Sequence, residues 1–298
     1  MIINMESLAQ LYTGFTAVFN AAFQETQTWY TRVAMTVPAN TRIMDYKFLL
    51  DFPMVREWIG DRQISSLEPK AFQVETKDWE ATIEVDRNDI EDDQLGFYNP
   101  IVAALAQEAR KHPEKLIADL MVGGFSTACY DGQNFFATTH PVGGGTVSNF
   151  GGGADTAWYL LDTSRMVKPF IFQLRRDVQL VRMDRQDDEH SFMRKKLRYG
   201  VDYRGAAAYG LWQMAYACKE TLNDTNYAAA RAAMMSVANA EGRPLGMSPN
   251  LLLVPPSLEA QAREILQAQF IIGDPTAGGA RTNVWQGTAD LLVVPELA

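Results

Sequence analysis

The sequence is poor in cysteine, with only Cys129 and Cys218 among its 298 residues. Two distant cysteines do not make a disulfide framework, so the composition fits a reducing compartment. The sequence also lacks an apolar run of about 18 residues, which a membrane-spanning helix requires. Its N-terminus lacks the basic and apolar regions of a secretory signal. We therefore expect a protein that is soluble and intracellular when made, with no membrane partner.

Positive charge is scarce as well. Lys and Arg total 27 against 36 Asp and Glu, which gives a formal net charge of −9. An acidic protein gains nothing from counterion release at a phosphate backbone, so sequence-specific nucleic-acid binding is not expected. Hydrophobic residues make up 47% of the chain. That share is enough for a sizeable core and for two substructures.

Common catalytic and ligand-binding motifs are missing too. The three histidines, His112, His140 and His190, are not paired at the spacing of metal ligands. The sequence has no H-E-x-x-H, G-x-S-x-G or C-x-x-C motif. Glycine triplets at residues 143–145 and 151–153 lack the following Gly-Lys-Ser/Thr of a phosphate-binding loop, so they indicate an ordinary loop. We expect no metal and no cofactor.

One arrangement resembles a catalytic set. Cys129 is followed by Asp131, Asn134 and His140, and a cysteine hydrolase needs a thiolate, a histidine base and an orienting carboxylate or amide. However, Cys129 ends an apolar helical stretch and His140 precedes Pro141 in a loop. A buried structural cysteine and a loop histidine are therefore the favoured interpretation, and we expect no catalytic residue. A cysteine-dependent hydrolase stays as an alternative.

What the chain does contain is a long helical pattern within residues 92–129. Asn99 is a suitable N-cap, Pro100 suits the first helical position, and Gly123–Gly124 offers a left-handed end. The predicted helix has about 24 residues and is roughly 36 Å long, and Pro113 is expected to kink or split it near Lys111. Its apolar positions recur at helical spacing, at Ile101, Leu105, Ala109, Leu116, Ile117, Leu120 and Met121.

Residues 1 to about 40 also show helical amphipathicity. Their apolar side chains recur three and four residues apart, at Leu8, Leu11, Tyr12, Phe15, Val18, Phe19 and Phe23. Two interpretations remain open. The segment is either the first helix of a globular core or an arm that packs on a neighbouring subunit, because so many terminal aromatics need a partner surface.

Residues 41–91 change to a two-residue period. Apolar positions alternate with polar ones in two short runs, at Phe72, Val74 and Thr76 and at Ala81, Ile83 and Val85. Alternation of this kind predicts strands with one covered face, and residues 46–58 are also rich in strand formers. We expect a long two-stranded ribbon. Because an isolated ribbon is marginally stable in water, it should lie on another copy of the chain.

The remainder mixes strands and helices. Residues 158–217 are rich in strand formers and are interrupted by the charged segment Asp184–His190, which predicts a turn or loop. Beyond them, the patterns predict helices at 226–240 and 258–268, a buried strand at 251–256 and a further strand at 291–294. These alternating elements indicate a small α/β unit.

Several stretches together resemble a known family, the major head subunit (major capsid protein) of Mu-like transposable tailed phages. The resemblance covers nearly the whole chain, in the family's order. Its stretches are Phe52–Arg62, Ile83–Asp93, Cys129–Phe136 with His140-Pro141, Trp158–Asp162, Lys168–Gln173 and Ala208–Ala215.

The resemblance implies an α+β fold of the Hong Kong 97 type found in tailed-phage capsids. It implies an N-terminal arm at residues 1–45, an E-loop hairpin at 46–91, a P-domain at 92–219 and an α/β A-domain at 220–298. The P-domain would contain a spine helix at 97–122 and strands within 158–217. Because the P- and A-domains exchange chain segments in this fold, that range also admits part of the A-domain.

The implied function is a late structural protein of the virion that assembles in the host cytoplasm. It would form pentamers and hexamers of an icosahedral head around double-stranded DNA, with only non-specific proximity to that DNA. The expected partners are a portal, a cement protein and a separate scaffolding protein, because Met1 leads directly into the arm; lysine–asparagine cross-links are not expected. A non-viral, encapsulin-like shell is the alternative with the same fold. The expected contacts between subunits are Phe15, Phe19, Phe23, Trp58, Arg62, Phe72 and Trp79.

Overall fold

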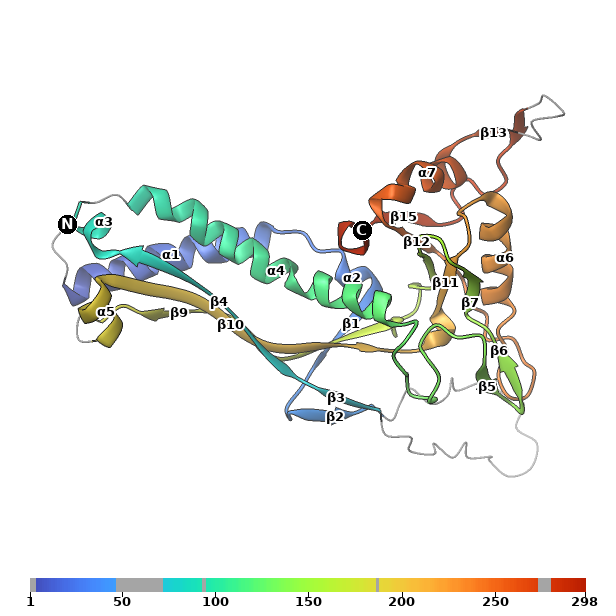
Figure 1. Ribbon diagram of the computed structural model, residues 1–298, viewed down its shortest axis with the longest axis horizontal. Helices are drawn as coiled ribbons and strands as arrows, with labels where there is room; N and C mark the ends of the chain where they lie inside the picture. Colours follow the sequence, from blue (N-terminus) through green and yellow to red (C-terminus); the bar gives the residue numbers. More distant parts are fainter. Residues whose placement is uncertain (1–3, 47–71, 93–94, 186–187, 273–279) are drawn as a thin grey trace.

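The computed structural model describes residues 4–46, 72–92, 95–185, 188–272 and 280–298. A long, narrow sheet and two helices form an extended part, and a second sheet with two helices forms the part at the far end (Figure 1). The shorter elements are α2 Tyr30–Val33, α3 Arg87–Glu91, η2 Leu95–Phe97, β5 His140–Val142, β6 Gly145–Val147, α5 Glu189–Arg194, η3 Trp212–Met214, η4 Pro256–Leu258, β13 Phe270–Ile272, β14 Ala280–Thr282 and η5 Pro295–Leu297.

The long sheet has the strand order β1-β9-β10-β4. Strands β9 (Phe170–Met183) and β10 (Lys196–Tyr209) form its antiparallel centre, β4 (Lys77–Asp86) pairs antiparallel with β10, and β1 (Ala34–Pro38) pairs parallel with β9. The charged segment Asp184–His190 separates β9 from β10, as predicted, but the short helix α5 begins within it at Glu189, where a turn or loop was expected. One face of this sheet is covered by helices.

Helix α4 spans Tyr98–Gly123, 26 residues, and continues through Pro113 without a break. Its apolar side chains pack in the cores beneath it, but Ile101 is 45% exposed and Val102 takes its place. Both predicted caps are wrong. The η2 turn leads directly into the helix, so Phe97 is the N-cap and Asn99 lies in the first turn.

Gly124 caps α4 in the right-handed region, at φ −62°. A left-handed glycine therefore does not end this helix. The role of the glycine is close packing instead, because a Cβ on Gly124 would lie 2.7 Å from the Phe136 ring.

Helix α1 (Met5–Glu25) lies beside α4 on the same face of the sheet (Figure 1). A capping box between Asn4 and Ser7 starts it. Its buried side chains Leu8, Leu11, Phe15 and Phe19 join residues of α4, β4, β9 and β10 in one core. Of the two interpretations of this segment, the structure has the first: within this chain, α1 is a core helix.

The expected ribbon at residues 41–91 is described only in part, at residues 41–46 and 72–91. Strands β2 (Ile43–Asp45) and β3 (Gln73–Glu75) form an antiparallel pair, and the predicted strand at 46–58 falls almost wholly outside the described residues. Strand β4, which follows β3, is hydrogen-bonded to β10 along its whole length, so the alternation at Ala81, Ile83 and Val85 reflects membership of the long sheet. A two-residue period indicates that one face of a strand is buried, but it does not identify the strand that pairs with it.

The second sheet has the order β15-β12-β8-β11-β7. Its strands are β7 (Phe150–Gly153), β8 (Trp158–Leu161), β11 (Ala215–Lys219), β12 (Leu251–Val254) and β15 (Asp290–Val293), and helices α6 (Asp224–Met235) and α7 (Glu259–Gln267) pack on it. The helices and strands predicted after residue 220 are present, but α6 ends at Met235 and not at 240, and β12 ends at Val254, before the two prolines. The strands within 158–217, however, divide between the two sheets, because β8 and β11 lie here and only β9 and β10 lie in the long sheet.

None of the helices in the described ranges combines the length and the apolar character needed to cross a bilayer.

Candidate functional site

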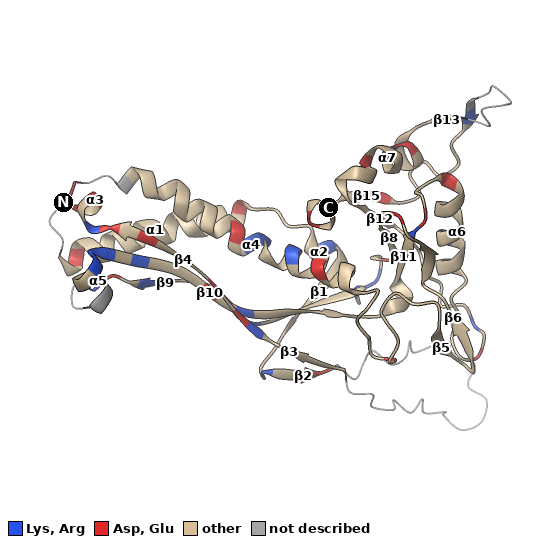
Figure 2. Ribbon diagram, viewed as in Figure 1, with Lys and Arg blue, Asp and Glu red and all other residues tan. Residues whose placement is uncertain are grey.

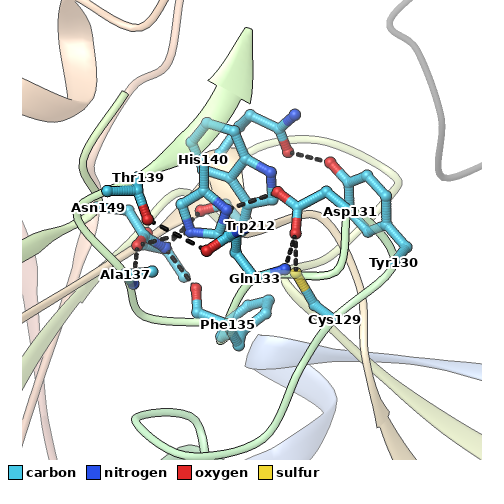
Figure 3. Close-up of polar contacts among 12 residues, drawn as sticks. Cys129, Tyr130, Asp131, Gln133, Phe135, Ala137, Thr139, His140, Asn149 and Trp212 are labelled. Atoms are coloured by element: carbon cyan, nitrogen blue, oxygen red, sulfur yellow. Dashed lines mark hydrogen bonds and ion pairs between the residues drawn. The ribbon is translucent and has the colours of Figure 1, made fainter. Parts of the chain in front are cut away.

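The loop after α4 brings Cys129, Asp131 and His140 together (Figure 3). The Cys129 thiol donates to Asp131 Oδ1 at 3.1 Å, and His140 Nδ1 lies 2.6 Å from Asp131 Oδ2. The fourth predicted member, Asn134, does not join them, because its amide donates to the Phe125 carbonyl. The sequence therefore identified three members of a real cluster and one false member.

Asn149, which the sequence analysis missed, completes the cluster. Its Oδ1 accepts the Ala137 N–H at 2.9 Å and lies 3.1 Å from His140 Nε2. Its Nδ2 lies within hydrogen-bond distance of the carbonyls of Phe135, Trp212 and Ala215. Its position between two glycine triplets carries no sequence signal for such a role, since the partners are brought close only by the fold.

The His140 ring is fully buried and stacks on the Trp212 indole, with ring centroids 4.0 Å apart and planes at 8°. Gln133 N–H also donates to Asp131 Oδ1, at 2.9 Å. Burial would raise the pKa of Asp131, but hydrogen bonds from His140, Gln133 and Cys129 hold that pKa below its ordinary value. Burial raises the pKa of the Cys129 thiol to about 12.

This geometry does not suit a cysteine hydrolase. The nucleophile must be a thiolate that can pass its proton to a base, and burial keeps Cys129 protonated at neutral pH. Both ring nitrogens of His140 are occupied by Asp131 and Asn149, and the carboxylate lies between the thiol and the ring. The cluster is arranged as a buried structural support.

The same three side chains are also candidates for a metal ion, since their ligand atoms lie within 4.8 Å of one another. Ligand atoms around a shared zinc ion are separated by roughly 3.3–3.8 Å, given bonds of about 2.0–2.3 Å. The 2.6 Å between His140 Nδ1 and Asp131 Oδ2 is instead a hydrogen-bond distance. The three side chains are therefore arranged for hydrogen bonding to one another, not for coordination of a metal ion.

Two surface features lie outside this cluster. The outer face of the long sheet carries cross-strand ion pairs (Figure 2), which join Arg204 to Asp78, Arg176 to Asp202, and Lys196 and Arg198 to Glu84. At the end of this sheet, next to α3 and α5, large apolar side chains are exposed: Met183, Phe192 and Met193, with Phe192 at 80% and Met193 at 70%. Exposed apolar groups of this size are typical of surfaces that contact another protein.

Comparison with known proteins identifies the family. Residues 8–297 match the family model for the Mu-like prophage major head subunit gpT. The chain is 36% identical over 310 residues to the major capsid protein of Escherichia phage Mu, covering 100% of both chains. The chain belongs to the Mu-like major head subunit family.

Solved structures agree with this family assignment. A chain of the procapsid of bacteriophage JBD30 is 35% identical, with a TM-score of 0.86 over 99% of this chain and 100% of that one. The JBD30 capsid decorated with minor capsid protein trimers gives 26% identity and a TM-score of 0.75 over 90% of both chains. The expected fold class is confirmed: this head subunit has the α+β capsid fold of the Hong Kong 97 type, and the resemblance read from the sequence is confirmed with it.

The contacts predicted between head subunits are not all at the surface. Phe15 and Phe19 are buried within the chain itself, so the described structure leaves them no surface for a neighbour. Phe23 is partly buried under Arg110, whose guanidinium lies 4.9 Å from its ring centroid.

Phe72 and Trp79 are partly buried and line a groove of about 550 Å³ between β3, α4 and the end of β10. Trp79 Nε1 also donates to the Gly205 carbonyl at 3.0 Å, so the indole is held in place by its own chain. The remaining two predicted contacts, Trp58 and Arg62, lie outside the described residues.

Proposed function

We propose that this head subunit builds the icosahedral shell of a phage head, as pentamers and hexamers that enclose double-stranded DNA in the virion. The full-length relation to the Mu major capsid protein carries the proposal. The exposed apolar end of the long sheet supports it, because a subunit whose work is repeated contact needs such surfaces. The acidic net charge of −9 supports a shell with little attraction for the packaged DNA.

The fold's parts are assigned within the same proposal. The long sheet with α4 is the P-domain and its spine helix, and the five-stranded sheet with α6 and α7 is the A-domain. The β2–β3 pair is the base of the E-loop, and α1 is the N-terminal arm in a form folded on its own chain. Because β7, β8 and β11 belong to the five-stranded sheet, the proposal assigns the strands within 150–161 and 215–219 to the A-domain.

The proposed partners are further copies of the chain, a scaffolding protein, a portal and a cement protein. The minor capsid protein trimers on the JBD30 capsid support the last of these. Assembly in the host cytoplasm and the absence of catalytic activity belong to the proposal. The buried thiol and fully occupied histidine of the cluster support a protein without hydrolase chemistry.

Electron microscopy of particles from cells that express the chain with its neighbouring phage genes tests the proposal. We expect closed icosahedral shells containing nuclease-protected DNA. Shells that hold protein cargo without DNA would favour the encapsulin-like alternative. A soluble monomer with hydrolytic turnover that Cys129→Ser abolishes would contradict the proposal, while Cys218→Ser is the matched control for loss of a buried thiol.

A further inference from the structure

We infer that Asp131 and His140 form a buried ion pair, with a proton on each ring nitrogen of His140, and that this pair fixes the joint between the spine helix and the five-stranded sheet. The inference concerns the folded chain, so it holds whether or not the chain assembles into shells.

The orientation of the Asn149 amide determines the first proton. Its Nδ2 faces three carbonyl oxygens, those of Phe135, Trp212 and Ala215, and its Oδ1 accepts the backbone N–H of Ala137. Carbonyls accept only, so the amide cannot be reversed. Asn149 Oδ1 therefore faces His140 Nε2 at 3.1 Å as an acceptor, and Nε2 must carry a proton.

The surroundings of Asp131 determine the second proton. Its Oδ1 already accepts from the Gln133 N–H and the Cys129 thiol, which leaves Oδ2 to face His140 Nδ1 at 2.6 Å. Two donors on one oxygen favour the ionised carboxylate, and the hydrogen bonds hold the pKa of Asp131 low against the effect of burial. An ionised carboxylate can only accept, so Nδ1 must donate.

The neighbours of the ring suit a cation. The Trp212 indole stacks on it face to face, with centroids 4.0 Å apart, and the face of an indole attracts positive charge. Two titratable groups close to the pair are the Cys129 thiol, on the same loop, and Tyr209 beside that thiol on β10. Burial raises the pKa of both groups to about 12, so both are neutral at pH 7. Neither therefore offsets the charge of Asp131 or of His140.

The pair lies where the two parts of the fold meet. Cys129 and Asp131 are in the loop that follows α4, His140 begins β5, Asn149 precedes β7, and Trp212 is in the turn between β10 and β11 (Figure 3). Separating these segments would leave a carboxylate or an imidazolium buried without its partner, which is strongly unfavourable. The pair therefore favours one geometry of the joint over others.

Nitrogen NMR of the assembled or soluble chain, labelled with 15N-histidine, tests the proton positions. The sequence has three histidines, so substituting each in turn assigns the ring signals. At neutral pH we expect both ring nitrogens of His140 to carry protons. A signal for an unprotonated Nδ1, or a metal-shifted signal that a chelator removes, would overturn the inference.

The variant Asp131→Asn is the sharper form of this test. An amide can keep Oδ1 towards Gln133 and Cys129 and donate from Nδ2 to the ring, so every hydrogen bond survives while the charge is lost. We expect the folded variant to have His140 protonated at Nε2 alone. Two protonated ring nitrogens in Asp131→Asn would show that the carboxylate does not hold the second proton.

Hydrogen exchange tests the role of the joint. His140→Ala should leave Asp131 buried without its partner and speed exchange at the Gln133 and Ala137 amides by about tenfold or more, with α1 amides unchanged. His112→Ala, which removes a half-buried histidine whose ring lies tilted against Trp79, is the matched control and should leave both amides unchanged. Equal exchange at these amides in wild type and His140→Ala would contradict the role, and an unfolded His140→Ala leaves the Asp131→Asn measurement to decide.

Discussion

Glu114 is a buried carboxyl on α4, 4% exposed, and its side chain accepts the backbone N–H of Trp29 at the start of α2. Burial raises its pKa, and the nearby Glu296 adds to the effect, although the N–H groups of Trp29 and Tyr30 and the charge of Lys111 oppose it. A carboxyl with a raised pKa contributes stability below its unfolded pKa, and that contribution is lost as the pH rises through the folded pKa. At neutral pH the ionised group is therefore a cost to the fold.

Replacing Glu114 with Gln should remove that cost. The amide oxygen can still accept from Trp29, so we expect unfolding of the subunit at pH 7 to require about 1 kcal/mol more, the scale of one hydrogen-bond difference. Denaturant titrations between pH 4 and pH 8 measure the unfolding free energy. As the pH rises, that free energy should fall less in Glu114→Gln than in the wild type. Glu108→Gln, an exposed change on the same helix, is the control. A loss of stability at pH 7 in Glu114→Gln would contradict the prediction.

Asp131 should affect the stability of the fold at acidic pH. Its pKa is lowered, so its contribution is present above the unfolded value of about 3.9 and is lost as the pH falls through the folded value. We predict that acid unfolding of the wild-type subunit steepens below about pH 4 and that Asp131→Asn flattens this limb. Circular dichroism against pH measures both, and parallel acid limbs for the two proteins would refute the expectation.

The sequence suggested part of this site and missed the rest for a physical reason. Cys129, Asp131 and His140 lie within twelve residues of one another, so their chemistry could be seen as a group. Asn149 and Trp212 join them through turns and strand pairing, which no local pattern reports. Asn134 was assigned to the group by proximity in sequence, but the turn directs its amide to Phe125.

At the scale of elements, periodicity predicted the helices well and their ends poorly. Helix α4 exists nearly where the apolar spacing placed it, since burial of that stripe dominates. Its caps depend on the preceding η2 turn and on contact with Phe136, both of which involve residues outside the periodic segment. The alternation at Ala81, Ile83 and Val85 was likewise assigned to the ribbon, whereas β4 pairs with β10, more than a hundred residues away.

The packing of Gly124 gives a prediction about the end of α4. Its φ of −62° allows any residue, so Gly124→Ala is not strained in its backbone, but the new Cβ would lie 2.7 Å from Phe136. We expect a loss of about 1–3 kcal/mol in unfolding free energy from overpacking. Gly14→Ala in α1 is the control, because nothing lies within 4 Å of its Cβ position. That change should stabilise the chain by up to about 1 kcal/mol. Equal effects of the two changes on chemical unfolding would be inconsistent with this account.

For the whole molecule, the order of strands in the two sheets was the hardest feature to predict. The segments β8 and β11 lie on either side of β9 and β10 in sequence, yet they belong to a different sheet. All four residues of β8 are buried, as expected of a central strand, but burial of a strand does not say in which sheet it lies. The family resemblance implies that the P- and A-domains exchange segments, an expectation compatible with strands that leave one sheet and return to another.

Assembly of the whole molecule into shells should depend on the exposed end of the long sheet. Phe192 on α5 is 80% exposed at the end of the long sheet, and a phenyl ring in water has no stabilising role in the isolated subunit. Phe192→Ser should therefore change subunit unfolding by less than about 0.5 kcal/mol, yet reduce the yield of shells, because a contact between subunits would lose apolar area. Met166→Ser, at a residue that is 95% exposed in another part of the chain, is the matched control. Shell yield measured by sedimentation decides: an unchanged yield in Phe192→Ser would remove this end of the sheet from the assembly contacts, and an equal loss in both variants would show that the effect is not specific to it.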